Sequence, residues 1–181
     1  MIAPVDITGV LLETERLILR PWTMDDLEDF YAYSSIEGLG QMAGWTPHKS
    51  MEESKVILDL FIRHKKTFAI EMKETGKVGG SVGIEEPDPD PEAEMLGREL
   101  GYALHKDYWG QGLMPEAVKA VISWCFDALH YDFLTCSHFD WNTQSKRVIE
   151  KSGFRYFSTT RSETRYETVE NSVNYILYRN K

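Results

Sequence analysis

Residues 102–117 run from a predicted strand, through a short loop with two glycines, directly into an amphipathic helix. Pro115 suits the first position of that helix, because the amide that proline lacks has no helical partner there. Gly110 and Gly112 leave the main chain open to a close approach by a ligand. Free amides at a helix start bind phosphate groups, so the segment predicts a pyrophosphate site, although a glycine before a helix is often only a turn.

The loop does not fit two familiar phosphate-binding motifs. A P-loop requires Lys-Ser or Lys-Thr after the last glycine, and a dinucleotide fingerprint requires a third glycine; both are absent. The segment Gly79–Gly83 has the spelling of a hydrolase nucleophile elbow, but residues 84–87, which end in proline, cannot begin a long helix. We therefore expect Ser81 to be an ordinary strand residue.

The rest of the chain alternates between the periodicities of strands and helices. Alternating apolar residues predict strands, and Ser50 followed by Glu53 marks a helix start. The predicted strands are residues 16–21, 67–72, 77–84, 99–104, 133–139, 154–160 and 172–178; the predicted helices follow Thr23 and cover residues 51–64, 115–129 and 142–151. This mixed order predicts an α+β or α/β sheet domain, and 181 residues fit a single domain over 1–181.

Charge and composition narrow the range of partners. The net charge of −9 disfavours nucleic acid and favours a cationic partner, although acidity also serves solubility. No apolar run approaches the roughly 20 residues of a membrane span, and residues 1–10 lack a secretory signal, so we expect a cytoplasmic protein without a membrane partner. Cys125 and Cys136 are expected to be reduced core residues. The five histidines lack metal-type spacing, so we expect no metal.

Four segments carry a family resemblance that covers nearly the whole chain. They are residues 14–21 (TERLILRP), 99–102 (ELGY), 109–117 (WGQGLMPEA) and 142–154 (NTQSKRVIEKSGF). In these segments the chain resembles the GCN5-related N-acetyltransferase (GNAT) family, and within it the RimJ/RimL-type branch that acetylates protein N-termini such as those of ribosomal proteins. The resemblance implies a central, mostly antiparallel sheet of about seven strands, splayed between the fourth and fifth and flanked by helices, with acetyl-CoA as co-substrate.

By this resemblance, main-chain groups in and before the loop hold acetyl-CoA. The residues that would cradle its pyrophosphate are Gly110, Gln111, Gly112, Leu113, Met114 and Pro115, and those that would pair with its pantetheine arm are Tyr102, Ala103 and Leu104. Trp109 and Met114 depart from the family's loop pattern, which matters little where amides do the binding. Gly101 independently suggests a β-bulge or a close backbone approach, or else a mere weak spot in the strand.

Acyl transfer to an amine needs a proton acceptor, an oxyanion donor and a proton for the departing thiolate. The resemblance makes Glu99 the candidate acceptor, directly or through water, and an N–H near Leu104 the oxyanion donor. The family's usual tyrosine acid is replaced by Ile149, and the N-terminus branch implies Ser145 instead. Asn142 shares that helix face near the thiol, or simply caps the helix; Glu99 and Ser145 have plain surface roles as their alternatives.

The main hypothesis is an N-acetyltransferase that acts on a protein N-terminal amine or a small cationic amine. A polyamine or antibiotic acetyltransferase is the alternative among enzymes. A catalytically silent acyl-CoA-binding sensor or scaffold is the alternative outside them, because the tyrosine acid is missing at Ile149. The resemblance implies that Phe30, Tyr33 and residues 38–48 line the acceptor side. Tyr108 and Trp109 either shape the acyl pocket or, as is commoner for aromatic residues beside a loop, plug the core. The sequence leaves monomer and homodimer open.

Overall fold

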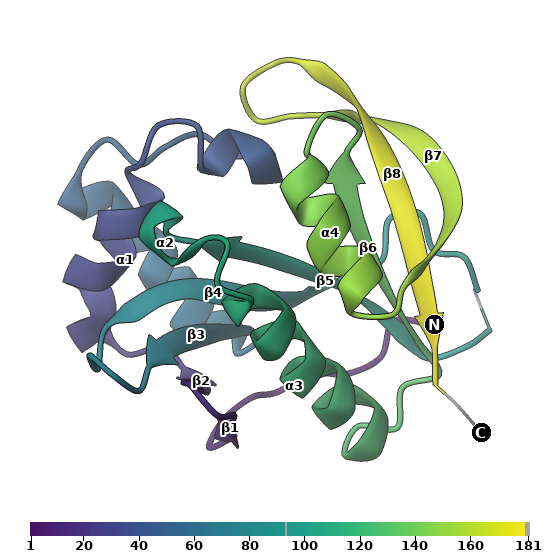
Figure 1. The fold of residues 1–181 in the computed structure, drawn as a ribbon, viewed down its shortest axis with the longest axis horizontal. Coiled ribbons are helices and arrows are strands. Elements are labelled where there is room, and N and C mark those ends of the chain that lie inside the picture. Colours follow the sequence, from purple (N-terminus) through teal and green to yellow (C-terminus); the bar gives the residue numbers. More distant parts are fainter. Residues whose placement is uncertain (93, 180–181) are drawn as a thin grey trace.

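The computed structural model describes residues 1–92 and 94–179 as one mixed sheet with helices on both faces (Figure 1). The strands are β1 (Leu12–Glu13), β2 (Leu17–Pro21), β3 (Thr67–Met72), β4 (Val78–Glu85), β5 (Gly97–Leu104), β6 (Phe133–Phe139), β7 (Arg155–Glu163) and β8 (Val169–Tyr178). The helices are α1 (Leu27–Ser34), α2 (Met51–His64), α3 (Leu113–Asp127) and α4 (Thr143–Lys151), with short 3₁₀ turns η1 (Met24–Asp26), η2 (Gly40–Ala43) and η3 (Lys106–Tyr108).

The sheet has the order β1-β2-β3-β4-β5-β6-β8-β7, and every neighbouring pair is antiparallel except β5 and β6. The mostly antiparallel α+β architecture is thus confirmed, with eight strands instead of about seven. The additional strand is β1, which has only two residues and therefore leaves no alternation to read. No helix within the described residues is long and apolar enough to cross a membrane.

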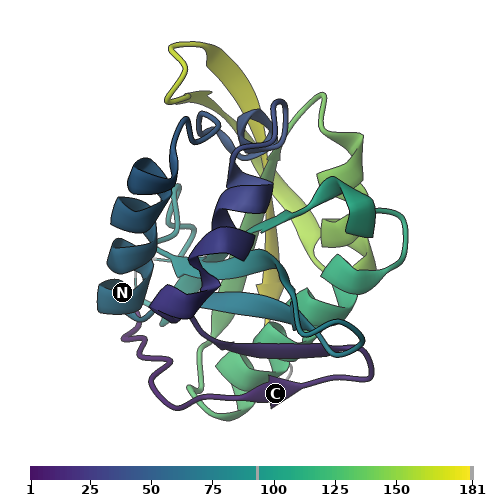
Figure 2. The ribbon, with the colours of Figure 1, turned by 90° about the vertical axis from the view of Figure 1, so that its left-hand side faces the viewer.

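The two faces of the sheet carry different helices, as the turned view in Figure 2 shows. On one face α1 and α2 pack against buried residues such as Trp22, Ala69 and Val78. On the other face α3 and α4 cover a larger core that contains Leu17, Leu19 and both buried, free cysteines. Leu17 and Leu19, which alternate with Ile18 in the sequence, are therefore both buried on one side of β2.

The parallel pair β5 and β6 separates after a short contact. Their register runs from Gly97 opposite Phe133 to Leu100 opposite Cys136 and then ends, while β6 continues along β8 as far as Phe139. Residues 101–104 therefore have β4 on one side and no strand on the other. This is the expected splay between the fourth and fifth predicted strands, and it opens the sheet where the functional residues gather.

Helix α3 begins two residues earlier than its sequence indicates. Gly112 is its N-cap, in a left-handed conformation with a φ of 76°, and Leu113 is the first helical residue. Pro115 is consequently the third helical residue and not the first, which corrects the prediction. The position is still compatible with proline, because amides in the first turn have no partner within the helix.

Candidate active site

A pocket of about 370 Å³ opens between the glycine loop, the start of α3 and α4, beside the splayed part of β5. Ten of the predicted cofactor-binding residues line it: Tyr102, Ala103, Leu104, Gly110, Gly112, Leu113, Met114, Pro115, Asn142 and Ser145. Tyr108 and Trp109 line it as well, and both also pack against the core. Gln111 is not part of this lining as the described residues define it, and its side-chain amide donates to Asp107 O at 3.0 Å instead. We call this space the cofactor pocket.

The loop presents main-chain donors to the cofactor pocket. Gly110 and Gly112 both have a positive φ, and a Cβ added to Gly110 would meet no atom within 4 Å. The amides of Leu113 and Met114 lie in the first turn of α3, where no helical carbonyl is available to them. These donors and the helix dipole fit a pyrophosphate, whereas Pro115 contributes only its ring, because it has no N–H.

Glu116 anchors the loop to the start of β2, a role that the sequence alone did not reveal. Its carboxylate accepts hydrogen bonds from Thr14 Oγ1 at 2.6 Å and from Arg16 N and Nε at 2.9 and 2.8 Å. Arg16 Nη1 donates in turn to Gln111 O at 2.9 Å. Partial burial raises the pKa of Glu116, but the hydrogen bonds from Thr14 and Arg16 outweigh it, and the net shift is downward.

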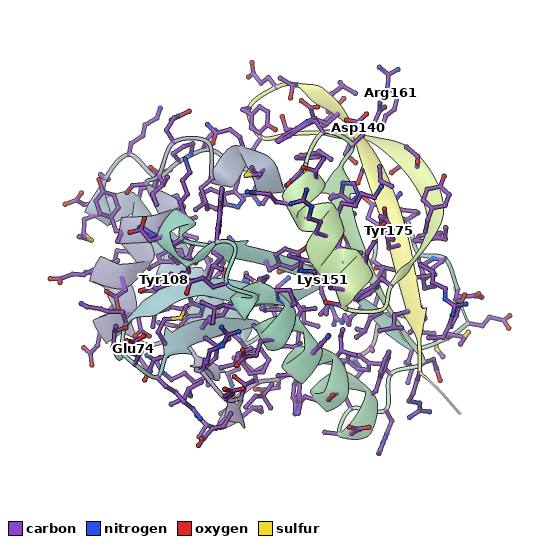
Figure 3. All side chains as sticks on the ribbon, in the orientation of Figure 1. Glu74, Tyr108, Asp140, Lys151, Arg161 and Tyr175 are labelled. Carbon is purple, nitrogen blue, oxygen red and sulfur yellow. The ribbon has the colours of Figure 1, made fainter. Side chains whose placement is uncertain are left out.

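Two cations on α4 also line the cofactor pocket. Arg147 and Lys151 are one helical turn apart, and both are exposed at its edge, where Figure 3 labels Lys151. Sequence reasoning missed them, although their spacing of four residues is the signal that places two side chains on one helix face. In a chain of net charge −9, these side chains supply positive charge where phosphate groups would lie.

The splayed strand keeps some of its main-chain groups free. The hydrogen bond from His105 N to Gly79 O fixes the phase of the β4–β5 ladder, so Ala103 bonds toward β4 while Tyr102 and Leu104 direct their groups to the side that β6 has left. Trp109 Nε1 donates to Leu104 O at 2.8 Å. The N–H of Leu104 therefore remains the main-chain donor closest to the loop.

Gly101 lies where β5 parts from β6, and it forms no bulge. The β4–β5 register passes through it without a shift, which corrects the bulge prediction. A Cβ on Gly101 would meet no atom within 4 Å, so its surroundings are open. The interpretations of this glycine as a close approach and as a mere weak spot in the strand both stay compatible with the structure.

Ser145 contacts a residue from the splayed strand. Its hydroxyl oxygen lies 2.8 Å from the phenol oxygen of Tyr102, and its amide donates to Asn142 Oδ1 at 3.1 Å. Asn142 thus caps α4, and it also lines the pocket; its contact with the cofactor stays a prediction. Burial raises the pKa of Tyr102 well above 10, which keeps the phenol protonated. Ile149 is 1% exposed and packs in the core.

A second pocket, of about 340 Å³, lies on the other face of the sheet, and we call it the acceptor pocket. It shares Ala43, Tyr102 and Ala103 with the cofactor pocket. Phe30, Tyr33 and several residues of the predicted 38–48 loop line it, and the loop members are Ala43, Gly44, Trp45, Thr46 and His48. The splayed segment of β5 is therefore a wall between two pockets that open on opposite faces.

A family model for the acetyltransferase (GNAT) domain matches residues 16–155 of this sequence. The chain belongs to the GNAT acetyltransferase family. It is an acyltransferase that depends on acetyl-CoA, the co-substrate of this family. Among its relatives, the uncharacterized N-acetyltransferase YoaA of Bacillus subtilis (strain 168) is 28% identical over 151 residues, which cover 80% of this chain and 82% of YoaA.

Two solved structures show the same fold. An acetyltransferase (GNAT family) from Bacillus anthracis superposes with a TM-score of 0.83 over 93% of this chain and 98% of its own, at 19% identity. The ribosomal-protein-S5-alanine acetyltransferase from Vibrio fischeri gives a TM-score of 0.76 over 95% and 98% of the two chains, at 21% identity. At these identities the likeness concerns the fold of this GNAT protein and not its acceptor.

Glu99 lies outside both pockets as the described residues define them. Its carboxylate accepts hydrogen bonds from Ser137 Oγ at 2.9 Å and from Asp88 N at 3.1 Å. Burial is the largest influence on its pKa, which is raised, and the nearby charges of Asp88 and Glu85 act in the same direction. Burial therefore favours the protonated carboxyl of Glu99 over its charged form, and the role of Glu99 as proton acceptor stays a prediction.

Two further predictions from the sequence concern Ser81 and metal binding. Ser81 is a strand residue of β4, and its hydroxyl oxygen accepts a hydrogen bond from Tyr33 at 3.2 Å. Within the described residues, no group of three or more His, Cys, Asp or Glu side chains could hold a metal ion.

Proposed function

We propose that this GNAT protein transfers an acetyl group from acetyl-CoA to a primary amine, either a protein N-terminal amine of the ribosomal-protein type or a small cationic amine. The observation that carries the proposal is the wall of Tyr102 and Ala103 between the two pockets. A thioester held on one side of the splayed strand and an amine on the other would meet at the gap in the sheet. Two-sided access of this kind serves direct transfer, because it holds both reactants in place.

Different residues would carry out the separate steps of the reaction. The amides of Leu113 and Met114, with Arg147 and Lys151, would hold the phosphates. The N–H of Leu104 would stabilise the tetrahedral oxyanion. The hydroxyl of Ser145 would protonate the departing thiolate, and Glu99 would take the proton of the amine through water.

Two observations support a cationic acceptor. The chain carries a net charge of −9, and Glu53 and Glu85 line the acceptor pocket. A negative field of this kind attracts ammonium groups, including the basic N-termini of ribosomal proteins. The Vibrio fischeri relative in structure is named for a ribosomal protein, which supports the peptide over the small amine and suits a cytoplasmic location.

A panel of acceptors tests this function. Purified protein is incubated with acetyl-CoA and with peptides that begin with alanine or serine, the same peptides blocked at the α-amine, spermidine and an aminoglycoside, while free thiol is measured. Thiol release with the peptide whose α-amine is free, and none with the blocked peptide, supports N-terminal acetylation. Release with spermidine or the aminoglycoside alone would establish the small-amine enzyme. Binding of acetyl-CoA without release on the whole panel would identify a silent acyl-CoA-binding module.

A further inference from the structure

A buried serine fixes the tautomer of His48 in the acceptor pocket. The hydroxyl oxygen of Ser54, on α2, lies 2.7 Å from His48 Nδ1, and Ser54 is 0% exposed. Among the described residues this hydroxyl has no other partner, so it donates its proton to Nδ1. Burial is the largest influence on the pKa of His48, which is lowered, so the ring is neutral at pH 7. A neutral imidazole that accepts at Nδ1 carries its proton on Nε2, which is therefore an N–H donor.

This donor is open to the acceptor pocket, which His48 lines. The imidazole ring packs against Phe30 and Trp45, with centroids 5.4 and 5.7 Å away. No described residue accepts a hydrogen bond from Nε2. The buried side-chain atoms without a partner in the described part of the chain are Trp22 Nε1 and Thr135 Oγ1, so Nε2 is accessible.

A second donor comes from the tip of the β7–β8 hairpin, which meets the loop between α1 and α2 (Figure 2). Arg165 N donates to Gly44 O at 3.0 Å, and the hydroxyl of Tyr166 donates to Gln41 O at 2.9 Å. These bonds fix the main chain where the exposed side chain of Arg165 lines the acceptor pocket. No described residue hydrogen-bonds or ion-pairs with its guanidinium.

The carboxylates that line the acceptor pocket are engaged by other groups. Glu53 accepts from Lys49 N at 2.7 Å, and Glu85 is ion-paired with Lys66. The donors of His48 and Arg165 are therefore left for oxygen atoms that the acceptor molecule brings. A peptide N-terminus brings a carbonyl oxygen next to its amine. A polyamine brings only further ammonium groups, which donate and do not accept.

We propose that Nε2–H of His48 and the guanidinium of Arg165 bind carbonyl oxygens of a peptide acceptor and thereby select a peptide N-terminus over a polyamine. The inference rests on the proposed acetyltransferase function and chooses between its two acceptors. The negative field of the chain attracts the α-amine, and the two donors hold the carbonyl groups that follow it. The charge of Arg165 also repels the second ammonium group of a polyamine. Both residues bind the acceptor, and neither takes part in the chemical step.

The first test compares kcat/KM for a peptide that begins with alanine and for spermidine, with the full chain and saturating acetyl-CoA. Arg165→Ala is expected to lower kcat/KM for the peptide by about 10-fold, the effect of one hydrogen bond from a charged donor, and to raise it for spermidine. Arg161→Ala is the matched control, because Arg161 is exposed on β7 and does not line the pocket (Figure 3). It removes the same charge and should keep the wild-type ratio of the two kcat/KM values.

Two substitutions of His48 separate its donor from its place in the fold. His48→Leu removes the N–H and is expected to lower the ratio of peptide to spermidine kcat/KM by about 5-fold, the effect of one neutral hydrogen bond. His48→Gln keeps a side-chain N–H near the position of Nε2 and should restore most of the ratio. A folding defect lowers the active fraction for both acceptors equally, so the ratio reports recognition alone.

The outcomes distinguish this inference from the function on which it rests. A wild-type ratio in Arg165→Ala or in His48→Leu overturns the proposed pair of donors while the acetyltransferase function stands. A wild-type protein that acetylates spermidine or free alanine, but not the peptide, overturns the peptide assignment in the same way. A wild-type protein that transfers no acetyl group to any acceptor removes both.

Discussion

The phenol oxygen of Tyr102 on β5 and the hydroxyl oxygen of Ser145 on α4 lie 2.8 Å apart and bridge the strand and helix that bound the cofactor pocket. The tyrosine acid that is usual in the family is replaced on α4 by Ile149, which lies in the core. A tyrosine hydroxyl nonetheless reaches the same pocket, from a different element. Ser145 is therefore supported by a protonated phenol, which orients its hydroxyl.

We predict that Ser145→Ala lowers kcat by about 10²-fold, because the thiolate loses its proton donor, while acetyl-CoA still binds. Tyr102→Phe should lower kcat less and reduce the free energy of unfolding by about 1 kcal/mol, the net value of one hydrogen bond. Steady-state kinetics and denaturant unfolding measure the two effects. Tyr156→Phe, which removes an exposed hydroxyl on β7, is the control. Equal kcat values for Ser145→Ala and wild type would exclude Ser145 as the acid.

Gly112→Val is predicted to abolish acetyl-CoA binding. Valine is disfavoured at a φ of 76°, and its Cβ would lie 3.7 Å from Nη2 of Arg16, the residue whose Nη1 holds Gln111 O in the loop. Calorimetric titration with acetyl-CoA measures the loss. Gly9→Val is the matched control, because Gly9 has a φ of 72° with no atom within 4 Å of an added Cβ and lies outside the pocket. It imposes the same backbone strain, and its affinity for acetyl-CoA should equal that of wild type; a normal affinity in Gly112→Val would contradict the pyrophosphate assignment.

Local patterns in the sequence were enough to predict most of this fold. Helix α2 has the predicted bounds of residues 51–64, because Ser50 accepts from Glu53 N at the first turn and a full apolar stripe follows. The glycine loop and the cap of α4 are equally local, since each is defined within a few residues. The predicted cofactor-binding residues rest on the family resemblance in addition, and most of them line one pocket.

Contacts between distant segments could not be predicted in this way. The hydrogen bonds between Glu116 and Arg16 join residues that are 100 positions apart in the sequence, and no local pattern predicts them. The carboxylate of Glu99 accepts hydrogen bonds from Ser137 on β6 and from the loop residue Asp88, and no local pattern indicates these contacts. The position of His48 in the acceptor pocket depends on how α1 and α2 pack, because its neighbours Phe30 and Ser54 come from those two helices.

The cations of α4 are predicted to contribute charge to acetyl-CoA binding. The double variant Arg147→Ala, Lys151→Ala should raise the Kd for acetyl-CoA, and the dependence of Kd on salt should weaken, because screening acts on fewer charges. Lys146→Ala, on the same helix, is the control, since Lys146 pairs with Glu150 and does not line the pocket. Titrations at two salt concentrations distinguish the variants. An unchanged Kd in the double variant would place the phosphates elsewhere.

Glu99→Gln is predicted to change activity and stability in opposite directions. The pKa of Glu99 is raised above 4.5, so the folded state binds the proton more tightly than the unfolded state. Its contribution to stability is full below 4.5 and is lost as the pH rises through the folded pKa. The glutamine variant avoids this loss, and its gain in unfolding free energy over wild type should be largest at neutral pH and shrink toward pH 4.

The same variant tests the water-mediated transfer of the proton. If Glu99 takes the proton of the amine through water, kcat falls in Glu99→Gln while acetyl-CoA binding is retained. A normal pH–rate profile in this variant would exclude Glu99 as the proton acceptor.

Glu116→Ala is predicted to destabilise the fold and to weaken cofactor binding together. The carboxylate accepts hydrogen bonds from Thr14 and Arg16, and bonds of this charged kind suggest a loss of about 2 kcal/mol in unfolding free energy at pH 7. Because the pKa of Glu116 is lowered, its contribution is present above 4.5 and is lost as the pH falls through the folded pKa. The difference between variant and wild type should therefore narrow in acid.

The weaker binding of acetyl-CoA is expected because Arg16, which Glu116 holds, also contacts the glycine loop. Arg16 holds Gln111 O through Nη1, so a loop without Glu116 loses the guanidinium that fixes its backbone. The Kd for acetyl-CoA should rise in Glu116→Ala, whereas Glu52→Ala, which removes an exposed carboxylate on α2, should leave both unfolding and binding as in wild type. Retained affinity in a clearly destabilised Glu116→Ala would show that the loop amides keep their arrangement without β2, and that Glu116 serves folding alone.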